Sequence, residues 1–543
     1  MTAPDPAGAG STPWTVRDAT RSLLRELGLT TVFGNPGTTE IGFLTDWPED
    51  FRYVLGLQES VVVAMADGYA HAARRPVLVN LHSAGGLGHG LGHVFTAYRN
   101  RTPMIVLAGQ QMRSMLPDDP FLGATDAVDF PKPYVRWSCE PARAQDVPAA
   151  LARAHHVATQ SPPGPVFLSV PADDWDAEAG EPVPVRARIT ACAPDPVALA
   201  GLAAALDASE RPGIVAGPAV DEDGAVPELV ALAETIGAGV WASGVSARCS
   251  FPEDHPLFRG FVHPERRATA AALGEHDLVV VLGAPAFTYH VHRGAAEVDL
   301  PALHVVSDDP DVLARAREGT GIRSSALLAV RALAGLVTQS DRARPPVRTR
   351  PRPPDDPGPD GSPVAAARVF ATLATLLPRD AIVVEEAPSH RNLMHDHLPV
   401  VSTDTGFLTT ASGALGYGLP AAVGAALARP DRTVVAVVGD GSAMYGIQAL
   451  WTAARERAGI TVVVLDNEQY SAVRTLGSAA GGRGPPGVDL GGLDFVGIAR
   501  GMGCPAESVE CPADLEAALS AALADPGPRL VHVRVDGRPP EMY

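Results

Sequence analysis

The sequence contains little lysine and lacks any long uninterrupted hydrophobic run. Lys132 is the only lysine, and 62 acidic residues against 43 basic ones give a formal net charge of −19. This balance excludes a protein that binds nucleic acids or anionic membranes non-specifically, because such binding needs a basic surface. No stretch approaches the roughly 18 apolar residues that a membrane-spanning helix requires, so we expect no membrane segment.

Cysteine is also scarce, and the five cysteines lack the spacing of metal ligands. They are Cys139, Cys192, Cys249, Cys504 and Cys511. An odd number of scattered cysteines argues against a disulfide framework and favours a reducing compartment, the cytoplasm. Residues 1–13 have neither the basic nor the apolar segment of a signal peptide, and we expect them to form a disordered tail.

Apolar material, by contrast, is abundant. Hydrophobic residues make up 46% of the 543 residues, which excludes a mainly disordered protein, and the length suggests about three to four domains. Short β-branched runs such as TTVFG, PVLVNLHS and MIVLAGQ alternate with Ala-rich helical stretches such as residues 58–73. Continuous apolar runs are typical of parallel strands that are covered on both faces. We therefore predict an α/β fold of doubly wound parallel sheets.

Two changes in composition divide the chain. The sequence becomes rich in proline near residue 183, and residues 341–362 hold too much proline, glycine and charge to form a core. We therefore predict three α/β domains, at residues 14–182, 190–340 and 363–543, with residues 341–362 as a linker.

The strongest motif lies in the third domain. The run TVVAVV ends in GDGS, with Asp440, and the run ITVVVL ends in DN, with Asn467; we predict a helix over residues 443–457 between them. One such crossover places both side chains at the carboxyl ends of parallel strands, where ligands bind. Carboxylate and carbonyl oxygens suit Mg²⁺, and the N–H groups of Gly441 and Ser442 suit a phosphate. An ordinary strand-to-helix turn with an aspartate cap is the alternative.

A second group of polar residues lies in the first domain. Glu59 follows the run RYVLGL and enters an apolar helix, where partial desolvation favours proton exchange. The turn NPGTTE (residues 35–40) follows TTVFG, and His82 follows PVLVNL. All three lie after consecutive strands, so one crevice can hold them. A glutamate that only complements the helix dipole, and a buried structural histidine, remain the alternatives.

Together these residues resemble the thiamine-diphosphate-dependent decarboxylase superfamily and, within it, most closely the benzoylformate decarboxylase family. The likeness covers nearly the whole chain and is carried by VFGNPGTTE, DWPEDFRYVLGLQE, ADGYA, NLHSAGG, AGQQ, PGPVFLSVPADDWD, GAPAFTYH, GALGYGLPAA, GDGSA and ALWTAA. The resemblance implies a pyrimidine-binding domain, a central Rossmann-like domain and a diphosphate-binding domain. It also implies thiamine diphosphate and Mg²⁺ as cofactors, and decarboxylation of a benzoylformate-like 2-oxo acid to an aldehyde and carbon dioxide.

The same resemblance implies roles for individual residues. The catalytic residues would be Glu59, His82, His290 and Thr38. The cofactor would be bound by Asn35, Pro36, Gly37, Glu59, Gly413, Leu415, Gly441, Ser442, Asn467 and Tyr470. The Mg²⁺ ligands would be Asp440, Asn467 and the carbonyl of Gln469. Because the two cofactor-binding domains of one site come from different subunits in this superfamily, the resemblance implies a homodimer or homotetramer with active sites at the subunit interface.

Several positions depart from the family pattern. His89 stands where we expect an asparagine near the cofactor, Thr38 replaces a serine, and Leu476 replaces a phenylalanine of the substrate pocket. Glu385-Glu386 is followed by Ala-Pro-Ser-His instead of a Ser/Thr-rich turn, which makes Ser389 a weak diphosphate ligand. The side chain of the 2-oxo acid therefore stays open: aliphatic, larger or substituted.

Three other functions compete with the decarboxylase. A carboligase or lyase of the benzaldehyde lyase or acetolactate synthase type would use the same cofactor to make 2-hydroxyketones, but the histidine pair favours the decarboxylase. A cofactor-free binding protein is disfavoured because Glu59, Asp440 and Asn467 are all present. A flavin-bearing oxidase is the third. We expect the run His-Asp-His at residues 395–397 to lie in a loop and to bind no metal.

Overall fold

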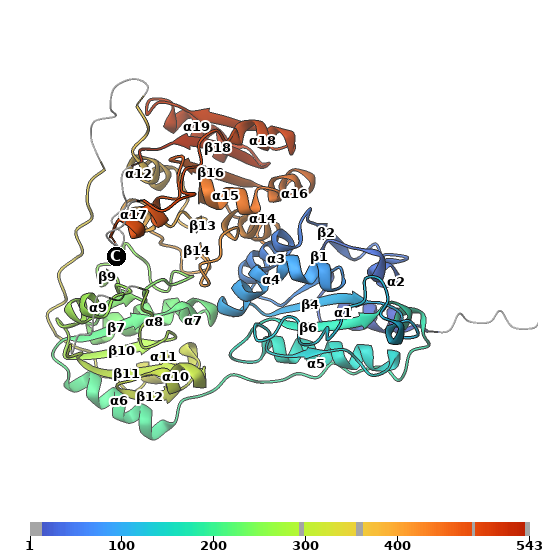
Figure 1. Cartoon of the computed structure of the whole chain (residues 1–543). Helices are drawn as coiled ribbons and strands as arrows, with labels where there is room; N and C mark the ends of the chain where they lie inside the picture. Colours follow the sequence, from blue (N-terminus) through green and yellow to red (C-terminus); the bar gives the residue numbers. More distant parts are fainter. Residues whose placement is uncertain (1–13, 291, 293–297, 354–361, 480–483, 538–543) are drawn as a thin grey trace, which may run out of the picture.

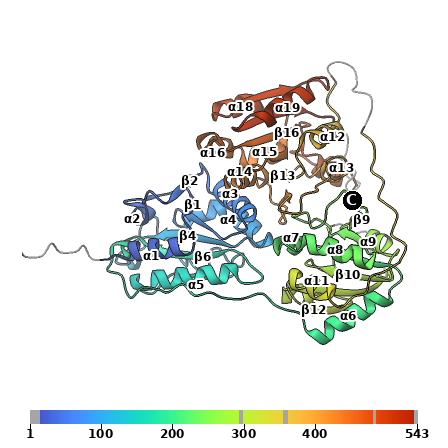
Figure 2. The ribbon, with the colours of Figure 1, turned by 180° about the vertical axis from the view of Figure 1, so that it is seen from behind.

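Three parallel sheets of six strands each form the framework of the chain. The computed structural model describes residues 14–290, 292, 298–353, 362–479 and 484–537; the expected tail and part of the expected linker lie outside these residues. Figures 1 and 2 show the sheets from opposite sides, each with helices on both of its faces. The prediction of an α/β fold with three doubly wound parallel sheets is confirmed.

The first sheet has the strand order β2-β1-β3-β4-β6-β5. Its strands are β1 (Thr31–Gly34), β2 (Arg52–Leu55), β3 (Val77–Leu81), β4 (Met104–Gln110), β5 (Ser138–Cys139) and β6 (Val166–Pro171). The α-helices around it are α1 (Val16–Glu26), α2 (Ile41–Leu44), α3 (Glu59–Ala73), α4 (Ser83–Arg99) and α5 (Val147–Thr159). Short 3₁₀ helices are η1 (Thr38–Glu40), η2 (Leu116–Asp118), η3 (Ala144–Asp146) and η4 (Ala172–Asp176).

The central sheet has the order β12-β11-β10-β7-β8-β9, which is the 3-2-1-4-5-6 order of the Rossmann fold. Its strands are β7 (Pro212–Ala216), β8 (Gly239–Ala242), β9 (Phe258–Phe261), β10 (Leu278–Leu282), β11 (Ala302–Ser307) and β12 (Thr320–Arg323). Its helices are α6 (Pro196–Ala208), α7 (Pro218–Glu222), α8 (Val226–Ile236), α9 (Arg266–Leu273), α10 (Pro310–Arg315) and α11 (Ala326–Ala334).

The third sheet has the order β14-β13-β15-β16-β18-β17, which repeats the topology of the first. Its strands are β13 (Ile382–Glu386), β14 (Phe407–Leu408), β15 (Val434–Gly439), β16 (Ile460–Asp466), β17 (Ala506–Val509) and β18 (Arg529–Arg534). Its helices are α12 (Ala366–Leu376), α13 (Arg391–His397), α14 (Gly418–Ala428), α15 (Asp440–Gly446), α16 (Ala449–Glu456), α17 (Ser471–Ala479), α18 (Phe495–Gly501) and α19 (Leu515–Ala524).

Two local predictions are wrong. The helix expected over 443–457 is two helices, α15 and α16, which break after Gly446. At that point α14 comes so close that a Cβ on Gly446 would lie 2.8 Å from the Pro420 ring. The run His-Asp-His belongs to helix α13 instead of a loop, because buried His395 donates from Nδ1 to Glu253 (2.8 Å) and lies against two aromatic rings. Among the described residues, no group of three or more His, Cys, Asp or Glu side chains could hold a metal ion.

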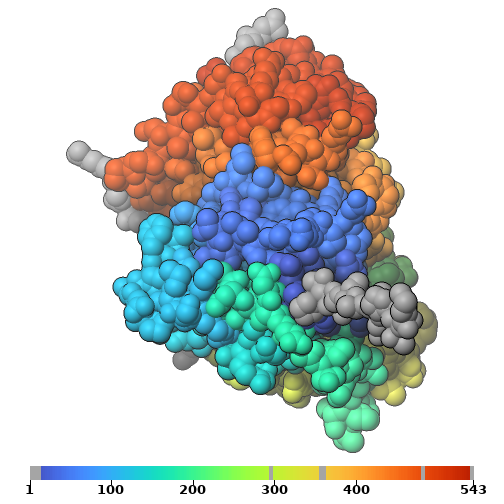
Figure 3. All heavy atoms as spheres, turned by 90° about the vertical axis from the view of Figure 1, so that its right-hand side faces the viewer, coloured from blue at the N-terminus to red at the C-terminus, as the bar shows by residue number. Residues whose placement is uncertain are grey.

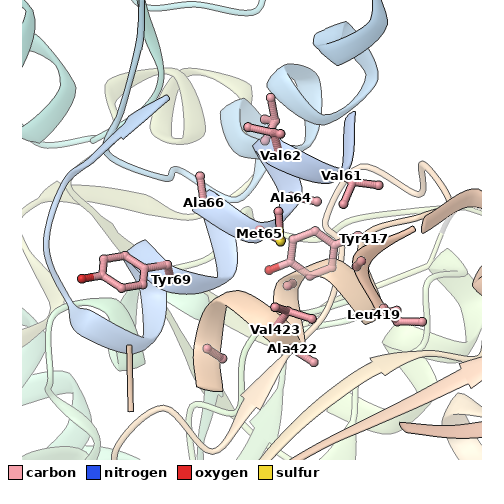
Figure 4. Close-up of a cluster of buried hydrophobic side chains, with 14 of the residues drawn as sticks. Val61, Val62, Ala64, Met65, Ala66, Tyr69, Tyr417, Leu419, Ala422 and Val423 are labelled. Carbon is pink, nitrogen blue, oxygen red and sulfur yellow. The ribbon is translucent and has the colours of Figure 1, made fainter. Parts of the chain in front are cut away.

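The first and third domains meet through α3 and α14. Figure 4 shows apolar side chains of the two helices packed together, and Figure 3 shows the two domains in contact at the surface. The backbones approach closely, since a Cβ on Gly68 would lie 2.1 Å from the Ala421 carbonyl oxygen and one on Gly424 would lie 1.9 Å from that of Met65. Only glycine fits at both positions, so this contact fixes α3, which begins with Glu59, against the third domain.

Within the part of the chain that the structure describes, none of the helices is both long and apolar enough to cross a bilayer.

Candidate active site

Three strand ends of the first sheet bring the predicted first-domain residues together. β1 lies between β2 and β3, and all three run parallel. The turn from Asn35 to Gly37 follows β1, Glu59 follows β2, and His82 follows β3. The order of the strands reverses at this point, which is where open α/β sheets form a ligand crevice.

The carboxylate of Glu40 organises this crevice, although it was not among the predicted site residues. The side chain is 1% exposed. Its two oxygens accept hydrogen bonds of 2.6 to 3.3 Å from five donors: the backbone N–H groups of Gly37, Ser83 and Gly109 and the side chains of Thr39 and His82. These five donors hold the carboxylate rigidly, and their hydrogen bonds compensate for the hydration that it loses on burial.

His82 is oriented by this carboxylate. Its Nδ1 donates to Glu40 Oε2 at 2.9 Å, and its ring is about one quarter exposed (24%). The proton is therefore on Nδ1, which leaves Nε2 to exchange protons with a ligand. A Cβ on Gly37 would lie 2.0 Å from His82 Nδ1, so glycine is required there. The threonine that contacts the ring is Thr39 (3.1 Å), whereas the predicted Thr38 is exposed.

Glu59 is the first residue of α3, and the side chain of Gln58 caps that helix by accepting the N–H of Val61. The Glu59 side chain is 14% exposed, and its Oε2 accepts from Nδ1 of His89 at 3.1 Å. A Cβ on Gly86 would lie 3.2 Å from Glu59 Oε1 and 3.3 Å from His82 Cβ. Glu59 and His82 therefore both border the space next to Gly86.

In the third domain, two of the three predicted metal ligands lie together, whereas the Gln469 carbonyl accepts the N–H of Ser471 at 2.9 Å. β15 and β16 are paired neighbours, so Asp440 and Asn467 stand side by side where these strands end. Asp440 Oδ2 and Asn467 Oδ1 both accept the backbone N–H of Gln469, at 3.1 and 3.3 Å. Burial, together with the neighbouring carboxylate of Asp466, raises the pKa of Asp440 to about 7. Two hard oxygens that lie this close together in an acidic environment are of the kind that binds a divalent cation such as Mg²⁺.

The predicted phosphate-binding residues lie beside this group. Gly441 and Ser442 are in the first turn of α15, whose N–H groups and dipole favour an anion. A Cβ on Gly441 would lie 2.3 Å from the Tyr470 ring, so the ring covers this glycine. Ser389, which lies before α13, is half-buried.

The segment from Gly413 to Gly418 carries Leu415 and is anchored in its second half. Glu386, fully buried at the end of β13, accepts the N–H groups of Gly416 (2.7 Å) and Gly418 (2.6 Å). Gly413 and Gly416 have φ values of +77° and +95°, which favour glycine. Burial raises the pKa of Glu386 to about 8.

Tyr417 ties the same segment to the first domain. Its hydroxyl donates to Asp67 Oδ1 of α3 at 2.8 Å, and both side chains are buried. Neither Asp67 nor Glu386 was predicted. The groups that donate hydrogen bonds to Asp67 and Glu386 lie far from these residues in the sequence. The only signal in the sequence was the acidic pair Glu385-Glu386 at the end of the run DAIVVEE.

His290 belongs to the central domain. Its backbone N–H donates to the carbonyl of Pro264 at 2.8 Å, which fixes it in the central domain. Its side chain is exposed, as is that of Leu476 on α17. Within one chain, the Glu59 group, the Asp440 group and His290 thus belong to three different domains.

Comparison with known proteins adds independent findings. Three domain models of the thiamine pyrophosphate enzymes match the chain: the N-terminal TPP binding domain at residues 14–130, the central domain at 199–333 and the C-terminal TPP binding domain at 388–533. Benzoylformate decarboxylase of Pseudomonas aeruginosa is 43% identical over 96% of this chain and 98% of its own length.

Two further matches differ in the chemistry that their names state. The putative acetolactate synthase large subunit IlvX of Mycobacterium tuberculosis is 34% identical and covers 94% of this chain and 96% of its own. The structure of a thiamine-diphosphate-dependent 4-hydroxybenzoylformate decarboxylase from Rhodococcus jostii has a TM-score of 0.91 at 39% identity and covers 96% of this chain and 99% of that one.

Proposed function

The chain belongs to the thiamine pyrophosphate enzymes, and from this membership we infer that it is a thiamine-diphosphate-dependent 2-oxo acid decarboxylase of the benzoylformate decarboxylase type. The observation that carries the inference is full-length identity of 43% to a benzoylformate decarboxylase, in a chain whose His82 is held at the crevice by Glu40. The product would be an aldehyde and carbon dioxide.

The cofactor would be held by residues of two domains. The oxygens of Asp440, Asn467 and the Gln469 carbonyl would bind Mg²⁺, and Gly441 and Ser442 would bind the diphosphate. The convergence of the first two oxygens on one N–H group supports this cation site. Tyr470 would cover the diphosphate end, because its ring already lies over Gly441.

The aminopyrimidine end would lie against the first domain. Glu59 would bond the ring nitrogen of the cofactor and exchange a proton with it, while Asn35, Pro36 and Gly37 line the crevice beside it. Gly413 and Leu415 would approach from the third domain, on the segment that Glu386 anchors.

Thiamine diphosphate supplies, when bound, the nucleophile and the electron sink that decarboxylation requires. The residues of this chain have simpler tasks. His82 holds a proton on Nδ1 and exchanges one at Nε2, Thr38 contacts the substrate carboxylate, and His290 supplies a second imidazole for proton transfer. The first-domain crevice excludes water from the reacting atoms.

We propose that the active site forms between two subunits, in a homodimer or homotetramer. The support is that Glu59 and Asp440 belong to different domains, and that the hydrogen bonds of Glu59 and Asp440 in the described chain stay within their own domains. A cytoplasmic location is part of the proposal; the five cysteines are all free thiols, which fits a reducing compartment.

The decisive experiment is a panel of aromatic and aliphatic 2-oxo acids, with and without an added aldehyde. We expect aldehyde and carbon dioxide to form without the added aldehyde, and aryl 2-oxo acids to react faster than short aliphatic ones. The 34% identity to a putative acetolactate synthase supports a carboligase as the second candidate. Hydroxyketone without free aldehyde would establish the carboligase and refute the decarboxylase.

The metal site has a test of its own. Asp440→Asn removes one charged oxygen of the predicted Mg²⁺ site, so we expect the thermal stabilisation by thiamine diphosphate plus Mg²⁺ to be lost. Chelation of the wild type with EDTA should have the same effect, and added Mg²⁺ should reverse it. Asp431→Asn, which removes an exposed carboxylate of the same domain, serves as control and should keep the full stabilisation.

A further inference from the structure

His89, which stands where the resemblance implies an asparagine, forms a hydrogen bond with Glu59. His89 lies on α4, and its Nδ1 is 3.1 Å from Glu59 Oε2. The histidine side chain is 69% exposed and that of the glutamate 14%. An N–H donor to a carboxylate forms a charge-assisted hydrogen bond, which fixes the rotation of the carboxyl group.

The other oxygen of Glu59 has a different environment. Oε1 faces Gly86, where a Cβ would lie only 3.2 Å away. The same Cβ would lie 3.3 Å from Cβ of His82. The missing side chain at Gly86 therefore leaves Oε1 next to the crevice, while Oε2 is occupied by His89.

A second histidine of α4 contacts the same turn in another way. His93 Nδ1 lies 3.0 Å from the hydroxyl of Ser60, the residue after Glu59. His93 is 4% exposed, and burial lowers its pKa to about 4. His93 therefore joins the two helices as a neutral, buried group, whereas His89 touches the carboxylate from the exposed side.

We propose that His89 is a positioning residue for Glu59: its Nδ1 holds Oε2 and thereby presents Oε1 to the aminopyrimidine ring of the cofactor. The inference rests on the proposed function of Glu59. A hydrogen on Nδ1 that is donated to Oε2 fixes the rotation of the carboxyl group.

The test compares two substitutions. His89→Asn keeps a side-chain N–H donor near the place of Nδ1, whereas His89→Ala removes the donor. We expect kcat to fall on the order of tenfold or more in His89→Ala, with KM for the 2-oxo acid unchanged, because only the orientation of Glu59 is lost. His89→Asn should stay within about threefold of the wild type.

The controls separate the possible outcomes. Arg99→Ala removes another exposed basic side chain of α4 and should leave kcat unchanged. Unchanged kcat in His89→Ala, an equal loss in His89→Asn, or an equal loss in Arg99→Ala would each overturn the positioning role. Full turnover in Glu59→Gln would instead refute the proposed function of Glu59.

A second measurement needs no turnover. In cofactor-free protein with ¹⁵N-labelled histidine, the resonance that His89→Asn deletes identifies His89. We expect its Nδ1 to be protonated, and we expect Glu59→Ala to shift this resonance because the acceptor is lost. The absence of any shift would show that the two side chains do not bond and would overturn the inference.

Discussion

At the residue scale, the carboxylate of Glu40 is the part of the crevice on which most contacts depend. Five donors meet its two oxygens, and one of them is the imidazole of His82. Removal of its charge weakens the hydrogen bonds of these donors, and nothing then keeps the proton of the His82 imidazole on Nδ1.

We therefore expect Glu40→Gln to lower kcat by about tenfold or more and to destabilise the fold by about 1–3 kcal/mol. Steady-state kinetics and thermal unfolding measure the two effects. Glu253→Gln is the matched control, because Glu253 is an equally buried carboxylate that bonds His395 at 2.8 Å, away from the crevice. It should lose similar stability and retain kcat; equal loss of kcat in both variants would contradict the role of Glu40.

The candidate site residues could be predicted from the sequence, but the buried carboxylates that orient them could not. Glu59, His82 and Asp440 follow apolar runs, so their places at strand ends could be predicted. Glu40 accepts a hydrogen bond from the backbone N–H of Gly109, 69 positions away in the sequence. Glu386 accepts one from the N–H of Gly416, 30 positions away. Such pairings appear only after the chain has folded, and no local pattern encodes them.

At the scale of elements, long buried strands could be predicted from their apolar runs, whereas short edge strands could not. Central strands such as β3, β10 and β16 are buried on both faces, and the sequence shows them as continuous runs of hydrophobic residues. β5 and β14 have two residues each, and β12 is mostly exposed. Strands this short, or this exposed, show no periodicity that distinguishes them from loops.

The anchored segment from Gly413 to Gly418 predicts a pH dependence of stability. The pKa of Glu386 is raised by burial from its ordinary value of 4.5 to about 8 in the folded protein. Between these values the folded state holds a proton that the unfolded state has released. The stabilisation that protonated Glu386 gives the folded state is therefore fully present below about pH 4.5 and is lost as the pH rises through 8.

Glu386→Gln removes this titration and keeps a neutral acceptor for one of the two N–H groups. We expect the melting temperature of the wild type to fall relative to that of the variant as the pH rises from 5 to 9, by the equivalent of a few kcal/mol at most. Scanning calorimetry of both proteins without cofactor measures this difference. The titration of Asp440 is common to both and cancels in the comparison. Parallel curves would show that Glu386 does not titrate in this range.

At the scale of the whole molecule, the arrangement of the domains decides how the site is completed. The first and third sheets have the same topology. The contact between α3 and α14 joins the two domains through helices (Figure 4). The hydrogen bonds of the Glu59 and Asp440 side chains go to residues of their own domains. In the proposed dimer, a second copy of the chain would supply the other half of each site, in the isologous way of a twofold dimer.

This arrangement predicts complementation between two inactive variants. Glu59→Gln and Asp440→Asn should each abolish most turnover, because each damages one half of every site. When the two are unfolded together and refolded as a mixture, half of the dimers are hybrids, and one of the two sites in a hybrid combines an intact Glu59 with an intact Asp440. We therefore expect about a quarter of wild-type activity in the mixture. Each variant refolded alone is the control. If both residues of a site came from one chain, every site would carry one of the two substitutions and the mixture would stay inactive.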